Sequence, residues 1–192
     1  MRESDVFATA LAETIALHEQ VQRADSRPVT DAARAIIESL QHDGCLLTFG
    51  NGGSAADAQH VAAELVGRFL RQRRSLAAVA LTTDTSILTS VANDDAFDRV
   101  FARQVEGLGR KGDVALGIST SGRSANVIAA FQAARALGLV TIAVTGGDGG
   151  GVGRLVDIHI NVPSDSTPRV QEVHRTLLHV ICDLVEQAFV ER

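Results

Sequence analysis

The sequence is poor in cysteine, proline and aromatic residues. Among 192 residues there are two cysteines, three prolines, and no tryptophan or tyrosine. Cys45 and Cys182 lie far apart in apolar surroundings, which argues against a disulfide framework and predicts two buried free thiols. With 45% apolar and 21% charged residues, the composition is that of a folded globular protein and not of a disordered chain. We therefore expect a single domain over residues 1–192.

Long apolar runs and runs of basic residues are also missing. Acidic side chains interrupt the first 20 residues, and no later apolar run is long enough to span a bilayer. Eighteen basic against 23 acidic residues give a net charge of −5, which argues against a nucleic-acid partner. The sequence predicts a cytoplasmic protein with neither membrane nor nucleic-acid partners. A small anionic ligand would need local hydrogen-bond donors.

Apolar residues first recur at helical spacing and then gather in short runs. Residues 1–43 are expected to form two N-terminal helices, and residues 44–192 an α/β core that includes the C-terminal helix. Runs typical of buried parallel strands lie at 45–49, 76–81, 113–119, 139–145 and 156–162. Helical stretches lie near 54–70, 84–92, 95–108, 123–137, 151–155 and 168–190. This alternation predicts an α/β sandwich, whose ligands bind at the carboxyl ends of the strands.

The first loop at such a strand end is GNGGS, at 50–54. It opens a helix, so its amides and the positive end of the helix dipole favour a phosphate or a sugar hydroxyl, and Asn51 adds side-chain donors. The letters GNGGSA also fit the loose dinucleotide fingerprint. That motif requires a carboxylate at the end of the second strand, where Asp84 comes too late. A tight turn that binds nothing is the alternative.

The second loop, STSGRS at 119–124, has four hydroxyl side chains in six residues between a predicted strand and a helix. Hydroxyls and backbone amides at a helix start can enclose a phosphate without a lysine. Helix capping is the alternative, although one serine or threonine would suffice for it. Neither loop is followed by Gly-Lys-Ser/Thr, which disfavours nucleotide hydrolysis.

Two helices carry the polar side chains best suited to chemistry. His60 and Glu64 are four residues apart and share a helix face. On the last helix, Gln171 and His179 are eight residues apart and displaced by roughly 80° around the axis. These side chains suit zinc or a similar divalent ion, or a glutamate base with a histidine acid. The alternatives are a surface pair for His60 and Glu64 and a core histidine for His179.

The sequence resembles the phosphoheptose isomerase family of the sugar-isomerase (SIS) domain superfamily over essentially its whole length. The resemblance rests on three blocks in order, which are GNGGSAADAQHVAAEL, ALTTDTSILTSVANDDAFDRVFARQVEGLGRKGDVALGISTSGRSANVIAAF and TPRVQEVHRTLLHVICDLVEQ. It implies a flavodoxin-like three-layer sandwich with a five-stranded parallel sheet. It also implies a homotetramer with active sites shared between subunits.

The implied reaction is the aldose–ketose isomerisation of sedoheptulose 7-phosphate to D-glycero-D-manno-heptose 7-phosphate, which supplies heptose for surface glycans such as lipopolysaccharide. Glu64 matches the general base of the family and His179 its general acid. The matching phosphate positions are Ser119, Thr120, Ser121 and Ser124. The matching sugar positions are Asn51, Gly52, Gly53, Glu64, Asn93, Asp94 and Gln171. The matching zinc positions, for one ion per subunit, are His60, Glu64, Gln171 and His179. No nucleotide or redox cofactor is implied.

Two positions depart from the family pattern. Pro168 stands where some relatives have an aspartate, with Asp165 a candidate replacement, and Asp95 stands where many have a tyrosine. The competing interpretation is a non-catalytic relative, either a phosphosugar-sensing regulator or an adaptor resembling the replication-initiator-binding factor. Such proteins need no acid–base pair, so Glu64 together with His179 favours the enzyme. A dinucleotide oxidoreductase would rest on the loose glycine pattern alone.

Overall fold

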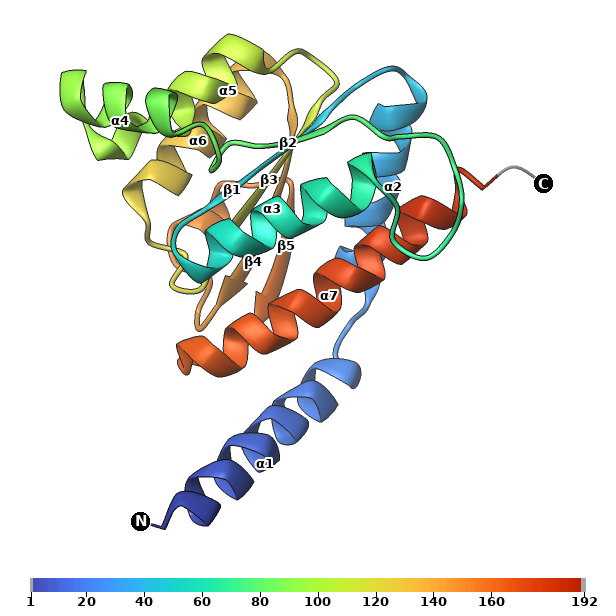
Figure 1. Cartoon of the computed structure of the whole chain (residues 1–192), viewed down its shortest axis with the longest axis vertical. Coiled ribbons are helices and arrows are strands. Elements are labelled where there is room, and N and C mark those ends of the chain that lie inside the picture. Colours follow the sequence, from blue (N-terminus) through green and yellow to red (C-terminus); the bar gives the residue numbers. More distant parts are fainter. Residues whose placement is uncertain (1, 191–192) are drawn as a thin grey trace.

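The computed structural model describes residues 2–190 (Figure 1). Within them, five parallel strands form one sheet in the order β2-β1-β3-β4-β5. The strands are β1 (Leu46–Gly50), β2 (Ala78–Ala80), β3 (Val114–Ser119), β4 (Val140–Gly146) and β5 (Ile158–Val162). The predicted α/β fold with a five-stranded parallel sheet is confirmed.

Helices cover both faces of this sheet. The middle strands are therefore buried on both sides and carry apolar side chains on both. The helices are α1 (Glu3–Gln22), α2 (Arg27–Gln41), α3 (Gly53–Val66), α4 (Thr85–Asp94), α5 (Ala102–Leu108), α6 (Ala125–Leu137) and α7 (Thr167–Gln187). Two 3-10 turns, η1 (Phe97–Arg99) and η2 (Val152–Arg154), complete the described elements. Helices α2, α3 and α7 pack on one face and α5 and α6 on the other.

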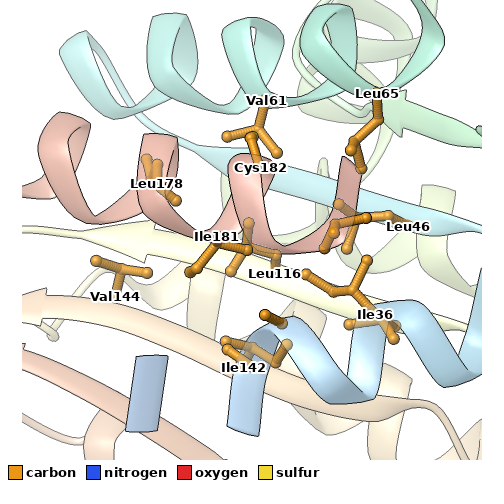
Figure 2. Packing of buried hydrophobic residues seen from close by; sticks show 14 of the residues in the cluster. Ile36, Leu46, Val61, Leu65, Leu116, Ile142, Val144, Leu178, Ile181 and Cys182 are labelled. Atoms are coloured by element: carbon orange, nitrogen blue, oxygen red, sulfur yellow. The ribbon is translucent and has the colours of Figure 1, made fainter. Parts of the chain in front are cut away.

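The larger of the two cores lies under α2, α3 and α7. Ile36 of α2, Val61 and Leu65 of α3 and Leu178 of α7 meet strand residues such as Leu116 there (Figure 2). All five side chains are at most 2% exposed. At about 25 cal/mol for each Å² of apolar surface removed from water, such side chains contribute roughly 1.5–3 kcal/mol each before entropy is counted. This packing fixes α3 and α7 side by side and running in the same direction (Figure 1).

Strand register brings the loops after the strands together. Gly50 at the end of β1 pairs with Ile118 near the end of β3, and Ser119 pairs with Thr145 of β4. The amino ends of α3, α6 and α7 follow β1, β3 and β5 at the same edge of the sheet. Three helix amino ends with unpaired amides therefore lie where the ligand loops were predicted.

The helix expected over 54–70 ends early, at Val66. Residues after Gly67 instead follow an irregular path to β2, because buried Glu186 of α7 accepts hydrogen bonds from the main-chain N–H groups of three successive residues. These are Phe69 at 2.8 Å, Leu70 at 2.7 Å and Arg71 at 2.7 Å. Each of these bonds removes a donor that a continuing helix would have used. The strand expected over 76–81 is correspondingly short.

The stretch expected to be helical over 95–108 is divided. Asp95 ends α4 with φ −127° and ψ −92°, and Ala96 is extended before η1 begins at Phe97. The predicted helix near 151–155 is the single 3-10 turn η2. The apolar pattern indicated helical backbone in both stretches but not the breaks within them.

Both cysteines are free thiols, as predicted. Burial raises the pKa of Cys182 to about 12 and that of half-buried Cys45 to about 11, so both are protonated at neutral pH. Within residues 2–190, no helix combines the length and the apolar character needed to cross a bilayer.

Candidate active site

The first loop lies between β1 and α3 and is held tightly against the rest of the fold. Gly52 has φ +56°, a conformation that favours glycine. A Cβ atom added at Gly50 would stand 2.8 Å from the carbonyl oxygen of Ile118. Asn51 exchanges two side-chain hydrogen bonds with Asn126 of α6, at 2.8 and 2.9 Å. This reciprocal pair of amides ties the first loop to the helix that follows the second.

The second loop keeps its hydroxyl groups away from helix capping. Ser124 is the N-cap residue of α6, yet its side chain makes no capping hydrogen bond. Its Oγ lies 3.2 Å from the Oγ of Ser119 instead. Gly122 has φ +61°, and a Cβ atom there would be 2.1 Å from the carbonyl oxygen of Gly149. The loop after β3 is therefore packed against the loop after β4, and the hydroxyls of Ser119 and Ser124 contact each other.

A pocket of about 560 Å³ opens beside this second loop. Its walls come from three segments, namely the second loop, the loop after β4 and the start of α7. They include Thr120, Ser121, Gly147, Asp165 and Thr167. The pocket has the place, the hydroxyl groups and the helix amino ends that an anion site requires. Asp165, the candidate replacement for the carboxylate missing at Pro168, lies in the same pocket.

The polar side chains of α3 and α7 meet farther along the two helices. His60 Nε2 lies 2.8 Å from His179 Nε2 and 3.4 Å from Glu64 Oε1. One ring nitrogen must donate and the other accept, so the two imidazoles share one proton between them. Partial burial lowers the pKa of His179, and electrostatic repulsion of its cationic form by His60 and Arg175 lowers it further. The sequence predicted three side chains that the fold brings together.

Between the loops and these histidines, α3 and α7 form two further contacts. The side chain of Gln171 covers Gly53, where an added Cβ atom would be 2.5 Å from Nε2 of the amide. One turn farther along, Arg175 donates a hydrogen bond to buried Asp57. Gln171 precedes His179 by about 12 Å of helix rise. Its place in a shared metal site with His179 stays a prediction.

The donor types at His60, Glu64 and His179 fit zinc, but their spacing is that of a hydrogen bond. Within residues 2–190, no three His, Cys, Asp or Glu side chains form a ready group for a metal ion. Two imidazole nitrogens on one tetrahedral zinc stand about 3.3 Å apart, so the rings would have to separate by about 0.5 Å. That adjustment lies within the reach of side-chain rotation on two packed helices.

Two predicted sugar-contacting residues lie apart from the rest. Asn93 and Asp94 are at the carboxyl end of α4, where Asn93 donates to Asp94 at 2.7 Å. Helix α4 has no buried residue, and the pocket that Asp94 lines contains none of the other predicted site residues. Asp84 is not free to bind a ribose, since its carboxylate caps α4 by accepting from Ile87 N at 2.9 Å. Pro168 occupies the first turn of α7, where proline is well tolerated.

Sequence reasoning missed four side chains that shape this region. They are Asp57, Arg73, Asn126 and Arg175. Arg73 is fully buried and donates to the main-chain oxygen of Glu64 at 2.7 Å. Asp57 and Arg175 lie three and four residues before His60 and His179, so helical spacing could have placed each on the same face as its histidine.

Comparison with known proteins identifies the family of the chain. The SIS domain family matches residues 11–146. A phosphoheptose isomerase of Roseiflexus sp. (strain RS-1) is 57% identical over 159 residues, which cover 83% of this chain and 81% of that protein. One from Pelobacter propionicus is 50% identical over 184 residues, covering 96% and 97%.

Solved structures give the same result. The structure of phosphoheptose isomerase from Neisseria gonorrhoeae matches with a TM-score of 0.92 and 46% identity, over 97% of this chain and 100% of that one. A phosphoheptose isomerase from Francisella tularensis matches with a TM-score of 0.94 and 35% identity, with the same coverage. The chain belongs to the SIS domain family and, within that family, to the phosphoheptose isomerases.

Proposed function

We propose that the protein isomerises sedoheptulose 7-phosphate to D-glycero-D-manno-heptose 7-phosphate, for nucleotide-activated heptose used in surface glycans such as lipopolysaccharide. The observation that carries the proposal is the meeting of Glu64, His60 and His179 on α3 and α7, two helices whose amino ends lie at the anion-type loops. The relatives named phosphoheptose isomerase support it. A non-catalytic phosphosugar regulator is disfavoured because it would need no such group.

The chemistry requires one proton to move between adjacent carbons through an enediol. A base near both carbons removes and returns the proton while an acid polarises the carbonyl oxygen, and the bound phosphate anchors the far end. We assign the base to Glu64 and the acid to His179. His60, hydrogen-bonded to His179, fixes the orientation of the acid, and the proton that the acid donates must be carried by the His179 ring. Ser119, Thr120, Ser121 and Ser124 would bind the phosphate, and Asn51, Gly52, Gly53 and Gln171 the sugar.

Zinc remains part of the proposal as an ion held by His60, Glu64, Gln171 and His179. Bound zinc would supply a Lewis acid for the carbonyl oxygen. A carboxylate that holds zinc is a weaker base, so metal binding and proton transfer at Glu64 compete.

We also propose that the chain acts as a homotetramer with shared active sites. Asn93 and Asp94 lie apart from the other predicted sugar-binding residues of their own chain, which supports completion of each site by a neighbouring subunit. Helix α1 carries exposed apolar side chains that would suit an interface, as Phe7 is 69% and Ile15 59% exposed.

The decisive experiment is a proton NMR assay of the purified protein with sedoheptulose 7-phosphate, with and without a chelator. We expect signals of the aldose phosphate to appear, and Glu64→Gln to lower kcat at least about 10³-fold while phosphosugar binding is retained. Glu38→Gln, an exposed change on α2, is the matched control and should turn over like the wild type. Full turnover by Glu64→Gln would refute the assignment of the base, and unchanged turnover with chelator would refute an essential metal.

A further inference from the structure

An ion pair between α3 and α7 lies between the two halves of the candidate site. Nη2 of Arg175 donates to Oδ1 of Asp57. Along α7, Gln171, Arg175 and His179 occupy successive turns of the same face. Gln171 lies against the first loop and His179 against His60. The guanidinium of Arg175 is therefore one helical turn from the predicted sugar site on one side and from the predicted acid on the other.

Asp57 fixes the position of this guanidinium. Its side chain is 4% exposed, so its carboxylate is removed from water and needs a charged partner. Asp57 projects from α3, which is itself packed into the main core through Ala58 and Val61. A cation bound to so rigid a carboxylate has little freedom to move. Arg175 is thus held in advance of any ligand, which lowers the entropy lost on binding.

Arg175 itself remains available to a ligand. Its side chain is 45% exposed, and within residues 2–190 its guanidinium makes one hydrogen bond, although the group has five N–H donors. It lines a pocket of about 520 Å³ together with Gly53, Ala56, Asp57 and Gln171. Two of these residues, Gly53 and Gln171, are already predicted to contact the sugar. If Arg175 served only to neutralise Asp57, its side chain could be buried, as the side chain of Arg73 is beside Glu186.

We infer that Arg175 is a further substrate-binding residue, which donates hydrogen bonds to hydroxyl oxygens of the sugar chain between the phosphate and the reacting carbons, with Asp57 as its positioning residue. This inference rests on the proposed function, since it takes the sugar to lie from the second loop towards His179. The ligand class is a phosphorylated polyol. Inorganic phosphate, which lacks the hydroxyl chain, would occupy the second loop without reaching Arg175.

The test compares two ligands on matched variants. Dissociation constants for sedoheptulose 7-phosphate and for inorganic phosphate are measured by calorimetry on the wild type, Arg175→Met and Arg135→Met. Arg135, on the distant helix α6, is the control because it is similarly exposed, at 48%, and pairs with Asp157. We expect Arg175→Met to weaken sedoheptulose 7-phosphate at least about tenfold, as for loss of a hydrogen bond from a charged donor, with phosphate changed less than about twofold. Arg135→Met should bind both ligands like the wild type.

Equal affinity of wild type and Arg175→Met for sedoheptulose 7-phosphate would overturn the inference, as would an equal loss for both ligands. If Arg175→Met does not fold, as judged by far-ultraviolet circular dichroism, the double variant Asp57→Asn/Arg175→Gln decides. It removes the buried charge together with its partner, and the same selective loss is expected from it. A wild type that binds sedoheptulose 7-phosphate without converting it would refute the proposed function and leave the comparison at Arg175 intact.

Discussion

At the scale of single residues, the anion pocket relies on groups without formal charge. The one arginine in the second loop, Arg123, makes a two-point ion pair with Asp148 at 2.9 and 3.0 Å. The N–H of Gly150 and the charge of Arg123 lower the pKa of Asp148, so this carboxylate is ionised at neutral pH. The two charges offset each other, which leaves hydroxyls and main-chain amides to bind phosphate.

Ser121→Ala should therefore weaken substrate binding and leave the chemical step almost unchanged. Its hydroxyl accepts a hydrogen bond from the N–H of Arg123 at 3.2 Å, and Ser121 lines a pocket that neither His60 nor His179 lines. We expect KM to rise about tenfold with kcat within about twofold, measured by steady-state kinetics. Ser75→Ala, an exposed change, should have wild-type constants. A large loss in kcat at unchanged KM would contradict a phosphate role for Ser121.

The sequence indicated much of the site at this scale, because its motifs are local. Two hydroxyl- or glycine-rich turns and the spacing of His60 and Glu64 are visible in short stretches. The partner of each side chain is not, since Asp57 and Arg175 are 118 residues apart and Asn51 and Asn126 are 75 apart. Helical spacing predicts on which face of a helix a side chain lies. It does not predict how two packed helices are rotated relative to each other.

At the scale of elements, Glu186 joins the end of α7 to the irregular segment after α3. Its carboxylate is 0% exposed and accepts from three main-chain N–H groups, with buried Arg73 at 3.6 Å. Burial raises the pKa of Glu186, but these hydrogen bonds together with Arg73 lower it more, so the net pKa is below the ordinary value. Arg73 in turn holds the main-chain oxygen of Glu64. This contact fixes the end of α3 that carries the proposed base.

Glu186→Gln should destabilise the fold by about 2–4 kcal/mol, because it leaves Arg73 buried without its partner. Folding lowers the pKa of Glu186. Its contribution to the free energy of unfolding is therefore complete above the ordinary glutamate pKa of the unfolded chain, and it is lost as the pH falls through the lower pKa of the folded state. The difference in melting temperature between wild type and variant should be largest near pH 7 and shrink in acid, as measured by circular dichroism. Glu106→Gln, on the surface of α5, is the control. A difference that stays constant down to strongly acidic pH would contradict this role.

The irregular segment after α3 also shows where the prediction of the fold failed. Apolar runs located both ends of all five strands within about two residues, because burial on both faces leaves a clear signal. The residues after Val66 remained compatible with a helix, and only a carboxylate 115 residues or more along the chain ends it. A local pattern carries no information on such a distant acceptor.

At the scale of the whole molecule, α1 stands away from the sheet and contacts the rest of the chain from about Ala10 onwards. Leu17 packs with Val162, Val170 and Val173, whereas residues nearer the amino end are exposed (Figure 1). Val6, Phe7, Leu11 and Ile15 are each at least 49% exposed. An apolar face of this kind on one helix favours burial in an assembly.

Replacing Phe7 and Ile15 together by glutamate should therefore reduce the mass of the assembly in solution. Light scattering coupled to size-exclusion chromatography measures that mass directly. Activity should fall with it if sites are shared between subunits, while the melting curve of the smaller species remains cooperative. Leu108→Glu, which changes a leucine that is 50% exposed at the end of α5, should keep the parental mass. An unchanged mass for the double variant would exclude α1 from the interface.

The absence of a free lysine or arginine from the second loop has a consequence for how a ligand is held. Hydroxyl groups and peptide N–H groups do not titrate in the physiological range, so the protein offers the same donors in mild acid and mild alkali. A phosphate monoester, by contrast, loses its second proton near pH 6. The affinity of the second loop for the phosphate group of the sugar would thus depend on the protonation state of the ligand, and not on that of any side chain around it.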